Sequence, residues 1–283
     1  MSKTGLVLEG GGFRGIYTAG VLDVLDERGL RFDGLIGVSA GAIHGCSFLS
    51  HQRGRSIRYY RKYCGDWRFM SFKSWFKTGD IVGAEFCYHE LPDKLDVYDH
   101  AAFEADGTPF YAVCSNVDTG KAEYIRLTDL RTQIDYVRAS ASLPYFSRIV
   151  ELDGKRWLDG GCTDSIPLAG FEKMGYGRNL VILTRPEDYR KKPELRLMPG
   201  LVYGRFKAFK AALQRRHEEY NSALDYLASR EAEGAAFVIR PSHALEISRM
   251  ESDPEKIELA YKLGREDAER AMPELLNWLE RGE

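Results

Sequence analysis

The chain has 283 residues, and its 40 Lys and Arg against 42 Asp and Glu give a formal net charge of −2. Its 44% hydrophobic and 29% charged residues are ordinary for a globular protein and argue against disorder, and the length suits one large α/β domain or two small ones. A total charge this close to zero gives no support to a general nucleic-acid binder, which is usually strongly basic.

Short apolar runs alternate with segments of helical periodicity along the chain. Because strands that alternate with helices favour a parallel sheet covered by helices, we expect an α/β fold with a mostly parallel central sheet. Pro273 should kink or restart the last helix. The predicted strands are residues 5–9, 34–38, 109–116, 122–127, 156–158, 179–184 and 235–240, and the predicted helices are residues 16–28, 40–49 and 253–279.

A glycine-rich loop follows the first predicted strand and precedes the first helix. Gly10, Gly12 and Gly15 fit the pattern G-x-G-x-x-G, which exposes backbone N–H groups at a helix N-terminus, where negative charge is stabilised. The loop could hold a dinucleotide pyrophosphate, with Asp33 placed for a ribose contact, or it could form an oxyanion hole for acyl transfer. A tight turn without a ligand is the third interpretation.

A serine stands between the second predicted strand and its helix. Gly37, Ser39 and Gly41 form the pattern G-x-S-x-G. A serine on such a sharp strand-to-helix turn is crowded by the side chains two positions away on either side, and glycine relieves that crowding. The helix dipole also stabilises negative charge at the serine oxygen. The pattern in this context predicts a nucleophile.

A serine nucleophile needs a group that accepts its proton. His217 lies in a run of charged helical residues and is expected on a solvated face, while His243, in a loop, remains a candidate general base. The stronger candidate is Asp159, which ends a predicted strand with Gly160 and Gly161, because parallel sheets hold their ligands at this edge. By itself, an Asp-Gly pair is more often a plain turn.

In this order, the glycine loop, the serine turn and the Asp159 loop resemble the patatin-like phospholipase family over about residues 5–185. The small residues at 139–144 also look like the family's segment ahead of its catalytic aspartate. The resemblance implies that Ser39 is the nucleophile and Asp159 the base of a dyad that forms an acyl-enzyme. By the same resemblance, Gly10, Gly11, Gly12, Arg14 and Gly15 would form the oxyanion hole, Gly37 and Gly41 the nucleophile elbow, and Gly160 and Gly161 the acid loop.

The family resemblance implies a serine acyl-ester hydrolase of the phospholipase type that acts on a lipid or another acyl ester and needs no metal or cofactor. We expect residues 5–185 to form the catalytic domain, with residues 186–283 a mainly helical extension packed on it. One alternative is a dinucleotide-binding protein that uses residues 10–15 as a Rossmann loop. Another is a catalytically inactive lipid-binding module.

Two stretches are strongly basic although the chain is not. Arg53–Lys77 carries eight Lys or Arg against one Asp and is rich in aromatics, and Arg185–Arg216 carries ten against three Asp or Glu. Such stretches suit peripheral contact with an anionic membrane surface, and the second could be a lid. The alternative is that their apolar stripes pack on the core. No nucleic-acid partner is expected, since no recognised binding fold accompanies them.

Cysteine usage and the first residues point to a reducing compartment. The number of cysteines is odd and none forms a C-x-x-C pair, so neither a disulfide framework nor a zinc site is expected. The apolar run at residues 5–8 is too short for a signal sequence, and no segment reads as a membrane span. We expect a cytoplasmic protein, in peripheral contact with membrane if the basic stretches face it.

Overall fold

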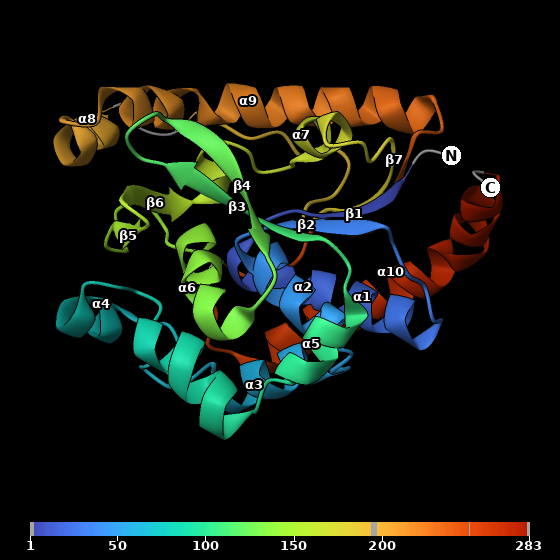
Figure 1. The fold of residues 1–283 in the computed structure, drawn as a ribbon, viewed down its shortest axis with the longest axis horizontal. Helices are drawn as coiled ribbons and strands as arrows, with labels where there is room; N and C mark the ends of the chain where they lie inside the picture. The colour runs from blue at the N-terminus through green and yellow to red at the C-terminus, as the bar shows by residue number, and fades with distance from the viewer. Residues whose placement is uncertain (1–2, 194–196, 249, 282–283) are drawn as a thin grey trace.

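The computed structural model describes residues 3–193, 197–248 and 250–281. An eight-stranded sheet runs through its centre in the order β5-β6-β3-β2-β1-β7-β8, with β4 also paired to β3 (Figure 1). The strands β3, β2, β1, β7 and β8 are parallel. β4 and β6 each pair antiparallel with β3, and β5 pairs antiparallel with β6. The predicted α/β fold with a mostly parallel sheet is confirmed.

The strands and helices follow the predicted order, with additional helices and one short strand, β5, between them. The strands are β1 (Thr4–Leu8), β2 (Gly34–Val38), β3 (Phe110–Asn116), β4 (Lys121–Leu127), β5 (Val150–Leu152), β6 (Lys155–Asp159), β7 (Arg178–Ile182) and β8 (Ala236–Ile239). The α-helices are α1 (Gly15–Glu27), α2 (Ala40–Leu49), α3 (Arg55–Tyr63), α4 (Phe72–Thr78), α5 (His100–Asp106), α6 (Leu130–Ser140), α7 (Leu168–Lys173), α8 (Leu197–Tyr203), α9 (Lys207–Ala232) and α10 (Pro254–Glu280). The short elements η1 (Gly12–Arg14) and η3 (Gly160–Cys162) are 3₁₀-helices, and η2 (Phe86–Leu95) is a π-helix.

Helices cover both faces of the sheet, with α7 and α9 on one side and α1, α2 and α10 on the other (Figure 1). The alternation of side chains along β1 explains the two layers. Leu6 and Leu8 pack into the cluster formed with α1, α2 and α10, whereas Val7 packs with α7 and α9. Strands buried on both faces read as continuous apolar runs, which is why β1, β2 and β7 could be predicted from sequence.

The last helix, α10, continues through Pro273 to Glu280 without interruption, so the predicted restart at this proline is wrong. Met272 and Leu275 on either side of the proline are buried in the core next to the sheet. Packing of this apolar face therefore holds the helix together where local propensity alone would break it.

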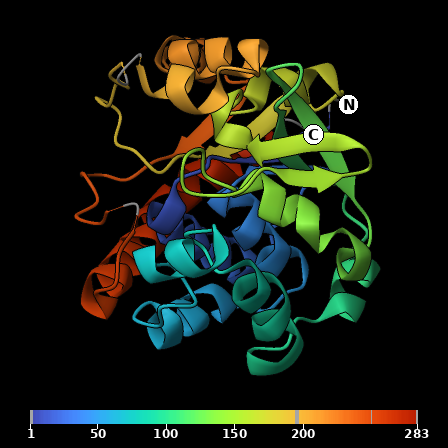
Figure 2. The same ribbon diagram turned by 90° about the vertical axis from the view of Figure 1, so that its left-hand side faces the viewer.

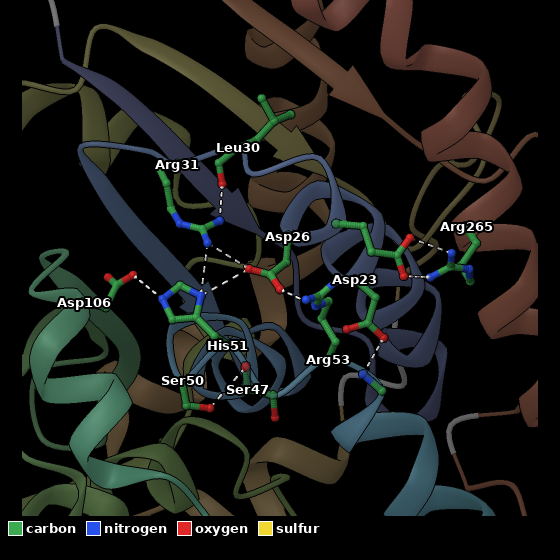
Figure 3. Close-up of polar contacts among 12 residues, drawn as sticks. Asp23, Asp26, Leu30, Arg31, Ser47, Ser50, His51, Arg53, Asp106 and Arg265 are labelled. Atoms are coloured by element: carbon green, nitrogen blue, oxygen red, sulfur yellow. Dashed lines mark hydrogen bonds and ion pairs between the residues drawn. The ribbon is translucent and has the colours of Figure 1, made fainter.

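Carboxylates from distant segments neutralise much of the first basic stretch. Arg53 pairs with Asp26 at 3.0 Å, and His51 lies between the carboxylates of Asp26 and Asp106, at 3.1 and 3.0 Å (Figure 3). Further pairs join Arg55 and Arg58 to Asp96, Arg61 to Glu258, and Arg68 to Asp66 and Glu90. The excess of positive charge in the sequence is therefore not an equally large excess on the surface.

The second basic stretch is divided between two helices. Phe206, Phe209 and Leu213 are buried around the start of α9, so this part of the apolar stripe packs on the core, while Val202 on α8 is half exposed. Arg196, one of its basic residues, lies outside the described residues. Among the described helices, none combines the length and the apolar character that crossing a bilayer requires.

Candidate active site

Ser39 occupies the sharp turn between β2 and α2 in a conformation that few residues other than glycine adopt. Its φ is +54° and its ψ −119°, which costs on the order of 1–3 kcal/mol and is typical of functional sites. Both flanking glycines are required by the turn. A Cβ on Gly37 would lie 2.7 Å from the nitrogen of Ala42, and one on Gly41 would lie 2.6 Å from the carbonyl oxygen of Leu8.

The structure brings Ser39 and Asp159 together although 120 residues separate them. The hydroxyl of Ser39 donates a hydrogen bond of 2.8 Å to Oδ2 of Asp159, and both side chains are buried. Oδ1 of Asp159 accepts the N–H of Gly161 at 2.7 Å, so the acid loop holds the carboxylate in place. In this surrounding of low dielectric the serine–carboxylate hydrogen bond is stronger than it would be in water.

The glycine loop lies directly against the serine turn. A Cβ on Gly10 would approach the Cβ of Ser39 to 3.2 Å, and one on Gly15 would lie 2.5 Å from the Cβ of Ala40. Gly12 has a φ of +58°, and the side chain of Arg14 is buried. The backbone of the loop at Gly10 therefore comes close to the nucleophile.

A buried glutamate beside the loop was missed by the sequence reasoning. Glu9 accepts the backbone N–H of Thr184 at 2.5 Å and its hydroxyl at 3.0 Å, and it accepts the hydroxyl of Tyr220 at 2.6 Å. These bonds tie the start of the glycine loop to the end of β7 and to α9. Burial raises the pKa of Tyr220, and the Glu9 carboxylate raises it further. No sequence pattern predicted these contacts, because Thr184 and Tyr220 are 175 and 211 residues away from Glu9 along the chain.

Two further serines form hydrogen bonds with the backbone of the dyad residues. Ser140 accepts the N–H of Ser39, and Ser115 donates its hydroxyl to the carbonyl oxygen of Asp159 at 2.7 Å. Ser140 lies in the small-residue segment that carried part of the family resemblance, so a signal existed, but it did not indicate this contact. Arg216 of α9 adds a bond of 2.5 Å from its Nε to the carbonyl oxygen of Gly161.

An apolar cavity of about 330 Å³ opens beside Ser39. Gly12 and Phe13 of the glycine loop line it, and α6 contributes Ile134 and Val137. Aromatic and aliphatic residues of α3, η2 and the segments that flank α4 also line it, namely Tyr59, Tyr60, Phe69, Met70, Val82, Tyr88 and Leu91. Arg, His and Asp residues contribute to the lining as well, namely Arg55, His89, Asp93, His100 and Arg131. The cavity is within the range of small-molecule sites, and its chemistry suits an acyl chain.

The histidines considered as bases lie apart from the serine. His243 is exposed beside Ser242, and His217 lies near Glu218 on α9. His44, one helical turn beyond Ser39, is buried, and burial lowers its pKa to about 3, so it is neutral and contacts Ser56. None of these three lines the cavity beside Ser39.

Comparisons with known proteins identify two regions of the chain. Residues 6–171 match the family model described as patatin-like phospholipase, and residues 206–280 match a domain of unknown function, DUF6363. The uncharacterized protein YjjU of Escherichia coli is 28% identical over 269 residues, which cover 93% of this chain and 75% of that protein.

Fungal lysophospholipases are also similar. Lysophospholipase NTE1 of Cryptococcus neoformans is 25% identical over 302 aligned residues and that of Saccharomyces cerevisiae 27% over 176. The chain spans 17% and 10% of the lengths of these two proteins. Among solved structures, VipD from Legionella pneumophila superposes with a TM-score of 0.46 at 13% identity, covering 97% of this chain and 67% of that one. Because the first family model covers more than half of the 283 residues, the chain belongs to the patatin-like phospholipase family.

Proposed function

We propose that this protein is a serine acyl-ester hydrolase that acts on lipid esters, with Ser39 as nucleophile and Asp159 as its base. The observation that carries the proposal is the 2.8 Å hydrogen bond from the hydroxyl of Ser39 to Oδ2 of Asp159. Membership of the patatin-like phospholipase family and the similarity to lysophospholipases support a carboxylic ester hydrolase of the phospholipase type.

In the first half of the reaction, the Ser39 oxygen attacks the ester carbonyl while its proton passes to the Asp159 carboxylate. The tetrahedral intermediate then collapses, the bond to the alcohol breaks, and the leaving alkoxide takes the proton back from Asp159. In the second half, water attacks the acyl-serine and gives its proton to Asp159. The acid is released as that proton returns to Ser39.

The negative charge of the tetrahedral oxygen needs donors that are already oriented. We assign them to the backbone of the glycine loop, Gly10–Gly12 with Gly15, with the guanidinium of Arg14 adding positive charge close by. Support comes from the approach of Gly10 to Ser39 and from the position of the loop at the start of η1 and α1. Loss of one oxyanion donor typically reduces the rate by ~10²–10³.

The apolar cavity supports a fatty acyl group as the acid portion of the ester. Ser39 lines one part of it, so a chain seated there would present its carbonyl to the nucleophile. A cavity lined so largely by aromatic and aliphatic side chains gives little recognition to a polar headgroup, which would remain toward solvent.

We further propose that residues 5–185 hold the catalytic machinery and that residues 186–283 form a mainly helical extension on the same unit. Three contacts support this division. β8 of the extension pairs with β7, Tyr220 bonds Glu9, and Arg216 bonds the acid loop. We place the protein in the cytoplasm, in peripheral contact with membrane.

The test compares purified protein with Ser39→Ala and Asp159→Asn on a panel of acyl esters and phospholipids. Both variants should lose about a thousandfold or more in kcat/KM while keeping the wild-type melting temperature. A fluorophosphonate probe should label wild-type protein and not Ser39→Ala. The exposed pair Ser229→Ala and Asp118→Asn serves as the control. Near wild-type turnover in either dyad variant would refute the assignment, as would stabilisation by NAD(P) in a protein without esterase activity.

A further inference from the structure

We infer that α4 and α8 form a membrane-insertion face beside the active-site cavity, which binds the bilayer mainly through exposed apolar side chains. This inference rests on the proposed function, since the face would bring a lipid ester to Ser39. It narrows the membrane contact expected from sequence to one short helix of each basic stretch, because the arginines of the first stretch are paired with carboxylates and α4 and α8 carry the exposed apolar groups.

The helix α4 presents its aromatic residues outward. Phe76 is 80% exposed and Phe72 is 52% exposed, whereas the buried residue of this helix is Ser74. Trp75 stacks edge-on against Phe76, with ring centroids 5.0 Å apart, and also contacts Phe146 at 6.4 Å. An amphipathic helix of a globular protein normally buries such a group, and an exposed cluster of this kind marks an interaction site.

The helix α8 repeats the arrangement with aliphatic side chains. Leu201 is 80% exposed, Val202 is 50% exposed and Met198 is 44% exposed. The helix is anchored by Tyr203, which is buried and packs edge-on against Phe209 of α9, with ring centroids 5.1 Å apart. The side of α8 that faces solvent is therefore apolar, while Tyr203 attaches the helix to the rest of the protein.

The loop at residues 145–148 contacts the two helices or the residues next to them, which supports the assignment of α4 and α8 to one face. The carbonyl oxygen of Phe146 accepts the N–H of Ile81 beyond α4 at 2.8 Å, and Asp80 binds Arg148 through its backbone N–H at 2.8 Å and its guanidinium at 3.0 Å. On the other side, the N–H of Tyr145 donates to the hydroxyl of Tyr203 at 2.9 Å. Figures 1 and 2 show α4 and α8 at the same end of the molecule, with β5 and β6 between them.

The same loop and the base of α4 lead into the cavity. Met70 and Val82 flank α4, form an isolated bridge with each other, and line the cavity together with Ser39. Leu143, where the loop begins, lines it too. A lipid entering from the proposed face would therefore meet the cavity that leads to the serine.

Positively charged side chains lie next to the exposed apolar residues. This combination favours a lipid surface, rather than an apolar protein, as the binding partner of the face. Lys73 and Lys77 each lie 4.9 Å from the ring of Trp67, and the side chain of Arg148 is 66% exposed while it binds Asp80. Aromatic residues next to lysines are the usual composition of interfacial anchors. Because the cations are few, anionic lipid should strengthen binding and should not be essential for it.

The experiment measures sedimentation of full-length Ser39→Ala protein with phosphatidylcholine vesicles, with and without 30% phosphatidylglycerol. Binding to both is expected, a few-fold stronger on the anionic vesicles. Phe76→Ser with Leu201→Ser should reduce partitioning tenfold or more on both. Leu276→Ser is the matched control, since this leucine is 41% exposed on the last turns of α10, at the opposite side of the molecule (Figure 1). Lys73→Gln with Lys77→Gln should remove only the preference for anionic lipid.

Three results would overturn the inference. The first is that Ser39→Ala protein does not bind vesicles, and the second is that Phe76→Ser with Leu201→Ser leaves binding unchanged. The third is that light scattering detects an oligomer which the double variant Phe76→Ser with Leu201→Ser dissociates, because the face would then be a protein interface. The same surface variants, made in protein that keeps Ser39, should hydrolyse a soluble butyrate ester at the wild-type rate. Because vesicle binding is measured on Ser39→Ala protein, failure of the membrane face and failure of the hydrolase proposal are separate results.

Discussion

The hydroxyl of Ser140 bridges the nucleophile turn and the sheet. It accepts the backbone N–H of Ser39 at 2.9 Å and donates to the carbonyl oxygen of Val113 at 2.6 Å, and it is fully buried. The unusual backbone of Ser39 is thus held by a side chain at the end of α6, in a segment 101 residues further along the chain. The conformation of the proposed nucleophile depends on this contact.

Ser140→Ala should therefore lower both stability and activity. Two buried backbone groups would lose a partner, which costs about 1–3 kcal/mol each at most, and Ser39 would be less firmly positioned. We expect about tenfold lower kcat with a smaller change in KM, measured on a soluble ester, and a lower melting temperature. Ser142→Ala is the control, because that hydroxyl follows α6 and donates locally to the carbonyl oxygen of Arg138. Equal losses in both variants would contradict a specific role of Ser140.

The bond between Tyr220 and Glu9 should support the glycine loop. Tyr220→Phe leaves a buried carboxylate with one donor fewer, which costs on the order of 1–3 kcal/mol. Melting temperature and kcat/KM should fall together. Tyr226→Phe on the same helix is the matched control, since its hydroxyl binds Glu172 at the surface. A loss of stability without any loss of kcat/KM would show that the contact does not position the loop.

The carboxyl group of Asp164 should make the stability of the protein depend on pH. Burial raises its pKa to about 6, although the hydroxyl of Tyr124 donates to it at 2.7 Å. The folded protein thus holds a proton that the unfolded chain releases above pH 4, so this group's contribution to stability falls as pH rises from about 4 through 6.

Asp164→Asn should remove that dependence. At pH 8 the variant should be more stable than wild type by roughly 2–3 kcal/mol, and the difference should vanish at pH 4. Urea unfolding at both pH values provides the measurement, with the exposed Asp225→Asn as the control. A variant less stable than wild type at pH 8 would show that the ionised carboxylate is needed in the fold.

The cavity predicts a change in chain-length preference. Ile134 of α6 lines it and is only partly buried by protein, so Ile134→Trp should fill space that a long chain needs. Hydrolysis of a palmitoyl ester should fall tenfold or more relative to a butyryl ester, while Ile134→Leu should preserve the ratio. An unchanged ratio in the tryptophan variant would place the acyl chain elsewhere.

The local patterns of the sequence were sufficient for the motifs and for every strand except the short β5. β1, β2 and β7 are continuous apolar runs, and Gly37, Ser39 and Gly41 satisfy a steric requirement of one turn. Such features depend on residues within a few positions of each other, so they are readable from the chain alone. The pairing of Ser39 with Asp159 also followed from motif order, by family resemblance rather than by geometry.

Only the tertiary structure decided which charges are neutralised, which helix faces stay exposed and what supports the dyad. Asp26 of α1 pairs with Arg53, and Tyr220 bonds Glu9 across 211 residues. The apolar stripe predicted for the second basic stretch is divided between α8, which ends at Tyr203, and α9, which begins at Lys207. These contacts join segments that no local periodicity connects, because they depend on how the layers pack. The sequence by itself determined most of the strands, the helices α1, α2 and α10, and the chemistry of the motifs. The packing of the layers determined which of these residues lie next to one another in the site.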